Sequence, residues 1–224
     1  MKIHFKKDKN SGLLVPQFGP IFQHQTSLSV DARACGTLSG GNLANCDTKP
    51  KAGTETTLWL FNRADLDVSS LTYDTNPMIL TGFSLNATKV AYKFKGIKSS
   101  NNPSSSMNRG RYINNWVHNL DFLLFDNSGA GKKVLTELAD SEVCAIVENK
   151  WKGTSGNMAF ELYGLGVGLV LTQASRNPSD ADTAGAWRLV LGPDQDQFED
   201  TPPLTIFDTD YETTKSFIVG LETA

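Results

Sequence analysis

Apolar residues recur along most of the chain at spacings typical of β-strands, with turn residues between the runs. Within Val90–Lys95 they alternate with polar residues, which is the pattern of a strand with one buried face. Turn residues between Leu85 and Lys89 predict a hairpin joining this strand to the one before it. The runs that predict strands are Thr57–Asn62, Ile79–Leu85, Val90–Lys95, Trp116–Phe125, Val143–Glu148, Met158–Tyr163, Gly168–Ala174 and Ala186–Leu191.

Two other segments have helical patterns. Ser128 is a candidate N-cap for a short helix over about Ala130–Asp140, because a serine hydroxyl can accept from the first free backbone N–H groups. Near the C-terminus, Thr209 and Glu212 have the spacing of a capping box, which predicts a helix of about ten residues. The apolar residues of the two helices are Val134, Leu135, Leu138 and Ala139, and Phe217, Ile218 and Leu221.

These elements predict a mainly β fold of the α+β type, a β-sandwich or barrel-like domain with one short flanking helix and a short C-terminal helix. Residues 1–56 are predicted as an extended N-terminal arm with loops, because this part is rich in Pro, Gly, Asn and Thr. Residues 57–192 form the predicted β-sandwich core. Residues 193–224 are predicted as an acidic linker followed by the C-terminal helix.

A long polar segment from Lys98 to Tyr112 interrupts the apolar pattern. It contains Pro and Gly, lacks acidic residues and is almost without apolar ones, so it is predicted as a loop. Loops this long inside a compact domain are usually functional or disordered. The residues proposed for contact with another subunit are Lys98, Asn101, Asn102, Arg109 and Arg111.

Composition limits the class of protein. The chain has 224 residues, of which 39% are hydrophobic, so it can form an apolar core. No apolar run approaches the roughly 20 residues that a membrane-spanning helix needs, so no membrane association is expected. The first ten residues are basic but no apolar stretch follows them, which argues against a secretory signal.

Charge is distributed unevenly although the net charge is only −3. Residues 1–112 carry +7, whereas residues 113–224 carry −10. The two parts are either solvated faces or complementary surfaces through which one copy meets the next. The acids proposed as a pore lining or stacking surface are Asp180, Asp182, Asp194 and Asp196.

Motifs for catalysis or cofactor binding fail on their spacing. Ser128–Lys133 resembles a phosphate loop, but it lacks the first glycine and the hydroxyl residue after the lysine. Gly164–Gly168 has the wrong spacing for a dinucleotide site and precedes a predicted strand. His118 and Asp121 lie three apart in a predicted strand and therefore point to opposite faces. No enzyme activity, metal or cofactor is predicted.

The cysteines do not suggest a disulfide scaffold. Cys35, Cys46 and Cys144 are predicted to be free thiols in a reducing cytoplasm. Cys35 and Cys46, both in a Gly-rich segment, could pair if the protein is oxidised.

The order of elements from Trp116 to Leu191 resembles that of the phage major tail tube protein family. The likeness extends over about residues 57–192. The segments that carry it are Leu120–Asp126, Lys133–Leu138, Phe160–Gly164 and Leu169–Thr172. In that family a β-sandwich with one flanking helix assembles into hexameric rings that stack into a hollow tube. A long loop or hairpin reaches the neighbouring subunit or ring, and the Lys98–Arg111 segment occupies the matching place.

The resemblance implies a structural virion protein of the phage tail, made in the cytoplasm of the bacterial host. Its partners would be copies of itself, other tail or connector proteins, and DNA that passes through the lumen without specific binding during genome ejection. A neutral or acidic lumen suits this role, because phosphate contacts dominate affinity for nucleic acid.

Two alternatives remain open. The loop-rich first 56 residues and the helix after Pro203 depart from the family and allow a head decoration or head–tail connector protein. A carbohydrate-binding β-sandwich would instead need exposed aromatic residues on one face. The tryptophans, expected mainly in the core or at interfaces, are Trp59, Trp116, Trp151 and Trp187.

Overall fold

The computed structural model describes residues 4–7, 14–17, 41, 51–98, 100–110, 114–195 and 197–223. The chain divides into two units, Met1–Asn45 and Cys46–Ala224. In the first unit, β1 (His4–Lys7) pairs antiparallel with β2 (Leu14–Gln17). Two segments of the predicted arm are therefore paired strands rather than loops. The rest of the predicted arm up to Pro50 lies outside the described residues except Gly41, and so do Cys35 and Cys46.

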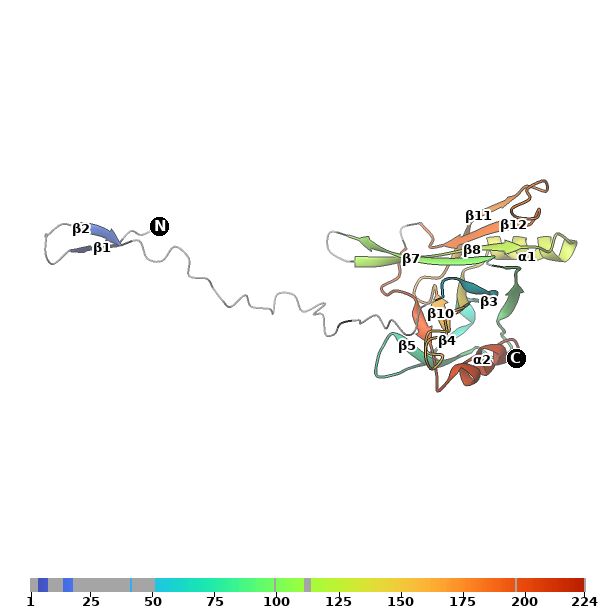
Figure 1. Ribbon diagram of the computed structural model, residues 1–224, viewed down its shortest axis with the longest axis horizontal. Helices are drawn as coiled ribbons and strands as arrows, with labels where there is room; N and C mark the ends of the chain where they lie inside the picture. The colour runs from blue at the N-terminus through green and yellow to red at the C-terminus, as the bar shows by residue number, and fades with distance from the viewer. Residues whose placement is uncertain are drawn as a thin grey trace. The chain divides into compact units, whose positions relative to one another are not determined.

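The second unit contains two β-sheets (Figure 1). The larger has seven strands in the order β4-β5-β13-β10-β9-β3-β6, and the smaller has four in the order β11-β12-β8-β7. The larger sheet comprises β3 (Thr54–Asn62), β4 (Leu66–Tyr73), β5 (Ile79–Leu85), β6 (Tyr92–Lys95), β9 (Val143–Asn149), β10 (Phe160–Tyr163) and β13 (Leu204–Ile206). The smaller comprises β7 (Asn101–Arg109), β8 (Asn114–Leu124), β11 (Val170–Arg176) and β12 (Trp187–Gly192).

Both faces of the larger sheet are buried along its central strands, such as β3 and β9. Along β3, Leu58 and Leu60 point toward the smaller sheet, whereas Trp59 and Phe61 point to the other side, because successive side chains alternate. All four are buried. This explains why β3 has a continuous apolar run rather than an alternating pattern.

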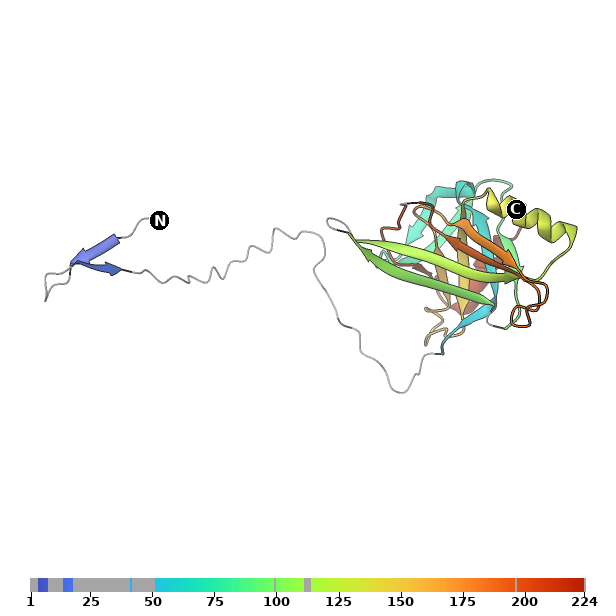
Figure 2. The same ribbon diagram turned by 90° about the horizontal axis from the view of Figure 1, so that it is seen from above.

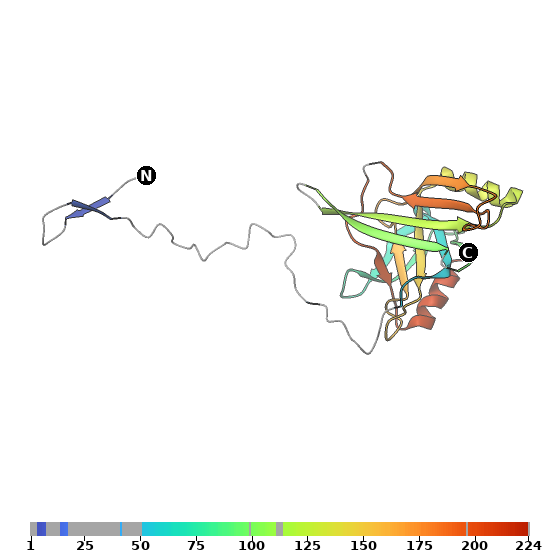
Figure 3. The same cartoon turned by 45° about the horizontal axis from the view of Figure 1, so that its top comes forward.

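Two helices complete the unit. Figure 3 shows α2 (Tyr211–Gly220) against the larger sheet, on the side away from the smaller one. Its Ile218 and Phe217 pack into the core on that side. Helix α1 (Gly129–Ala139) lies beside the smaller sheet, and its Leu138 joins the core between the two sheets.

The two helix starts differ in how well they were predicted. The Ser128 hydroxyl accepts from the backbone N–H of Gly131, so Ser128 is the N-cap of α1 as predicted. At α2 the N-cap is Asp210, whose carboxylate accepts from the N–H of Thr213 at 2.8 Å. The predicted capping box of Thr209 and Glu212 is therefore wrong by one residue, because the carboxylate of Asp210, the next residue in sequence, accepts from the free N–H group.

The mainly β fold with two helices is confirmed. One local prediction is wrong, and two strands were missed. β5 pairs with β4 and β13 rather than in a hairpin with β6, which lies at the opposite edge of the sheet. The missed strands are β4 and the short β13, which lies between the predicted acidic linker and the C-terminal helix.

The most informative error concerns the polar segment after Lys98. Residues Asn101–Arg109 form strand β7 and pair with β8 along their whole length. The predicted loop is therefore one arm of a long hairpin, which Figure 2 shows extending from the body of the second unit. Its residues are polar because most are exposed.

Candidate functional site

The outer face of the four-stranded sheet is polar and nearly uncharged. Leu120 and Phe122 of β8 and Leu189 of β12 are buried against the larger sheet, so the intervening residues face outward. The outward residues of the hairpin are Asn102, Ser104, Ser106 and Asn108 on β7 and Asn115, Val117, Asn119 and Asp121 on β8. Among the described residues of this face, charge is confined to Asp121 and Arg188, which form a salt bridge.

The sheet ends in two edge strands, β7 and β11. Each has one strand neighbour in the part of the chain that the structure describes. Successive residues of β7 direct their backbone N–H and C=O groups alternately toward β8 and toward the open edge. The Leu123 N–H donates to the Ser100 carbonyl at 3.2 Å, so Ser100 is a residue whose backbone groups face β8. Counting along the antiparallel register, Ser105 and Met107 direct their backbone groups away from β8, toward the open edge.

Pro103 fits this parity. It lies two residues before Ser105, so its backbone nitrogen, which has no hydrogen to donate, also faces the open edge. The edge therefore lacks one hydrogen-bond donor near Pro103, whereas Ser104–Arg109 keeps its outward N–H and carbonyl groups. An edge of this kind is a template for pairing with another chain.

The far end of the β7–β8 hairpin is the most exposed part of the sheet. β12 pairs with β8 only over Leu120–Leu124, and β7 is exposed from Ser104 to Arg109. Next to it, Trp116 exchanges two backbone hydrogen bonds with Glu199. The side chain of Met107 is 53% exposed.

The residues proposed for subunit contact separate into three groups. Lys98 and Arg109 are exposed at opposite ends of the segment, and Asn102 faces outward from β7. Asn101 is buried, and its side-chain amide donates to the carbonyl of Glu55, so it ties β7 to the larger sheet. Arg111 lies outside the described residues.

The described residues of the proposed acidic lining, Asp180, Asp182 and Asp194, lie in loops rather than on a sheet face. The carboxylate of Asp180 accepts from the Thr183 hydroxyl and the Asp182 N–H, so it organises the turn before β12. Asp182 and Asp194 are exposed. Asp196 lies outside the described residues. Their role as a lining stays a prediction.

A buried polar network links β8 to the segment after β12. The Gly164 N–H donates to Nδ1 of His118 at 3.2 Å, so Nε2 carries the hydrogen and donates to the Thr201 carbonyl at 3.1 Å. Burial lowers the pKa of His118 below its usual value, although nearby Glu199 opposes this. His118 is therefore held neutral, as a structural group.

Glu199 completes the network. Its carboxylate is buried and accepts from the N–H groups of Gly166 and Val167, at 2.9 and 3.0 Å. Arg63 donates to the carbonyls of Leu165 and Gly166 from the other side. The Gly-rich turn that resembled a dinucleotide fingerprint is thus filled by the protein's own side chains.

A second buried acid fixes α2 to the larger sheet. Burial alone would raise the pKa of Glu148, but hydrogen bonds from Lys152 and Tyr211, together with the charge of Lys215, lower it below its usual value. The ring of Tyr211 stacks on Phe160 with centroids 5.7 Å apart. All the partners of this carboxylate are internal, so the cluster is structural.

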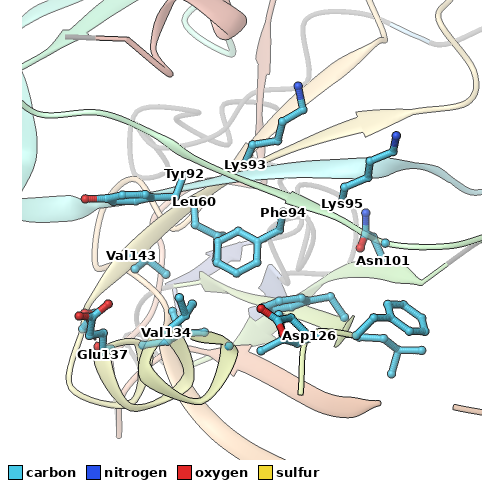
Figure 4. A pocket seen from close by; sticks show the side chains of 18 of the residues that line it. Leu60, Tyr92, Lys93, Phe94, Lys95, Asn101, Asp126, Val134, Glu137 and Val143 are labelled. Carbon is cyan, nitrogen blue, oxygen red and sulfur yellow. Dashed lines mark hydrogen bonds between the residues drawn. The ribbon is translucent and has the colours of Figure 1, made fainter. Parts of the chain in front are cut away.

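A cleft of about 950 Å³ opens between β6, the end of β8 and α1 (Figure 4). Its floor includes Phe94 and Phe122, whose rings meet edge to face with centroids 5.7 Å apart. Val134 lines it from α1. Gly131 is required where α1 begins, because a Cβ there would lie 2.1 Å from the Asp126 carbonyl. No pattern in the sequence predicted this cleft, since its walls come from segments far apart in the chain.

The described residues contain no cluster of three or more His, Cys, Asp or Glu side chains arranged to hold a metal ion. Neither described helix is long and apolar enough to cross a membrane. Trp59 is buried and Trp116, Trp151 and Trp187 are half-buried, so they form no exposed aromatic row of the kind a carbohydrate-binding module would need.

No protein-family model, no curated protein and no solved structure matches the chain.

Proposed function

We propose that this protein is a structural subunit of a phage tail tube, a β-sandwich that assembles into rings stacked around a DNA-conducting lumen. The observation that carries the proposal is the four-stranded sheet with its two open edges, β7 and β11. The sequence resemblance supports the same role, because it equates the Lys98–Arg111 segment, which includes the exposed strand β7, with the family's subunit-contacting loop or hairpin.

The strand directions suit ring formation. All neighbours in the order β11-β12-β8-β7 are antiparallel, so β11 runs opposite to β7. A β7 edge placed beside the β11 edge of a second copy would therefore continue the antiparallel pattern. This contact joins two different surfaces, and repeated contacts of that type generate a closed ring when the rotation closes.

The outer face of the sheet suits a lumen that conducts DNA. Its polar side chains are mainly Asn, Ser and Gln, and the described charges are paired as Asp121 and Arg188. A surface without free positive charge offers no strong phosphate contacts, so the polyanion can slide past it.

The test is to block the open edge without breaking the sheet. In Ser105→Pro the lost N–H is one that faces the open edge, so the bonds between β7 and β8 remain. We expect the wild-type chain to form rings and tubes and Ser105→Pro to stay monomeric and folded. Ser105→Ala, which keeps the N–H, is the matched control.

Native mass, circular dichroism and negative-stain microscopy provide the measurements. A wild-type chain that is monomeric at high concentration and low salt would refute the proposal. Closed particles or capsid-bound copies in place of tubes would favour the head decoration or connector role instead. Rings that persist in Ser105→Pro would show that the β7 edge does not form them.

A further inference from the structure

The cleft beside α1, called the slot below, is open because no described strand or helix covers the ends of β8 and β6 on that side of the second unit. β7 begins at Asn101, opposite Phe122, so Leu124 at the end of β8 lies beyond the β7 pairing. On the other sheet, β6 is an edge strand among the described residues. α1 forms the remaining wall. The result is an apolar slot open to the outside.

The slot is lined by two basic and two acidic residues, and the acidic ones lie on its α1 side. On β6, Lys93 and Lys95 flank Phe94, and Figure 4 shows both lysines directed away from the slot while Phe94 points into it. Lys93 is in addition paired with Glu222. The α1 side presents Asp126 and Glu137.

Asp126 is held in its charged form by its own turn. Hydrogen bonds from Ser128 lower the pKa of Asp126 below its usual value. Glu137 pairs with Lys133, but both side chains are exposed, so that pair is weak and can be exchanged. The slot therefore suits a partner that is apolar at its tip and positively charged.

The far end of the β7–β8 hairpin has this chemistry. Met107 and Arg109 are exposed there. Met107 lies opposite Trp116, on the face of the smaller sheet that is turned toward the larger sheet. The sequence contains no acidic residue between Lys98 and Leu120. The hairpin end is thus basic, with an unburied methionine that can adapt to an irregular apolar site.

The hairpin end cannot fill the slot of its own chain. It lies at the Asn114 end of β8, whereas the slot is lined by Phe122 and Leu124 at the other end. Figures 1 and 2 show the hairpin extending away from α1, which forms one wall of the slot. Arg109 pairs with Asn114, and the slot begins at Phe122, eight residues further along β8, or ~26 Å at ~3.3 Å per residue.

We propose that the slot between β6 and α1 binds the β7–β8 hairpin end of a second copy, with Met107 against its apolar floor and Arg109 beside Glu137 and Asp126. The contact is head to tail and runs along the strand direction, at right angles to the edge pairing. It rests on the proposed function and assigns this slot to the stacking of one ring on the next.

A charge exchange tests the contact. Arg109→Glu and Glu137→Lys should each raise the protein concentration needed for stacking by about tenfold or more, because like charges then meet. The double variant should stack again. Asp140→Lys is the matched control, since this exposed acid lies at the same helix end but not in the slot. Sedimentation and microscopy separate single rings from tubes.

Cross-linking tests the geometry independently. Met107→Cys and Val134→Cys are placed in one chain that also carries Cys35→Ser and Cys46→Ser. Cys144 stays, because it is buried and its thiol donates to the Gly164 carbonyl. A thiol cross-linker much shorter than the separation within one chain should give a ladder of dimers, trimers and longer species. Replacing Met107→Cys by Ser69→Cys, on β4, should give none.

The outcomes distinguish the two proposals. Rings that stack normally in Arg109→Glu, a double variant that fails to recover, or rings without a cross-linked ladder would overturn this inference and leave the tube subunit standing. Absence of any wild-type assembly would overturn both. Dimers without longer species would indicate a symmetric contact and would also overturn the head-to-tail arrangement.

Discussion

The two sheets of the second unit use their side chains in opposite ways. The central strands of the seven-stranded sheet are buried on both faces, by the smaller sheet on one side and by α2 on the other. Its buried acid, Glu148, has Lys152 and Tyr211 as internal partners. The four-stranded sheet buries one face and leaves a polar face, two edges and a long hairpin exposed.

This difference separates stability from interaction. Apolar burial is the main favourable term in folding, so the larger sheet should carry most of the free energy of unfolding. The smaller sheet contributes a surface whose backbone groups and side chains remain available to other copies. Substitutions in the two sheets should therefore have different consequences.

The largest effect is expected in the larger sheet. Phe160 is buried and its ring contacts both Trp59 and Tyr211. Phe160→Ala should lower the free energy of unfolding by about 3–5 kcal/mol, because it leaves a cavity that the surrounding sheet cannot close. Urea unfolding in the Ser105→Pro background measures this without a contribution from self-association.

The control is Ser106→Ala, on the outer face of β7. It should change the free energy of unfolding by no more than about 0.5 kcal/mol, since the residue is exposed. Equal effects for the two substitutions would show that the sheets do not divide these roles.

His118 provides a test where β8 meets the segment after β12. Its pKa is lowered from 6.5 in the folded protein, so the unfolded chain binds more protons as the pH falls below about 6.5. Stability should accordingly decrease from that pH downward. His118→Gln should flatten the thermal unfolding profile between pH 8 and 5. An unaltered slope in His118→Gln would mean that another group titrates.

The smallest effect on the free energy of unfolding is expected at the N-cap of α2, the helix that covers the larger sheet. Asp210→Ala should lower the free energy of unfolding by about 1 kcal/mol, because the N-cap carboxylate no longer accepts from Thr213. Thr209→Ala should have little effect. Urea unfolding measures both variants. A larger loss of stability in Thr209→Ala than in Asp210→Ala would support the capping box that the sequence pattern predicted.

Local pattern predicted elements where a strand or helix carries its own signal. The Ser128 cap of α1 and the limits of β5 were read directly from neighbouring residues. β7 was missed because its partner β8 supplies the hydrogen bonds and its exposed side chains leave no alternating apolar pattern. The β5–β6 hairpin failed because a short connection does not reveal that β6 pairs with the distant β3.

For the candidate site, sequence alone indicated that the acid-free segment ending at Arg109 was unusual and that no catalytic motif was complete. It could not show that Glu199 and His118 bond to the Gly-rich turn, that Ser105 faces an open edge, or that Phe94, Val134 and Phe122 share a slot. These features depend on strand register and on contacts between segments far apart in the chain. The spacing of apolar residues and the composition determine which residues can be buried. Only the pairing of strands in the tertiary structure decides which edges remain unpaired and which clefts remain open.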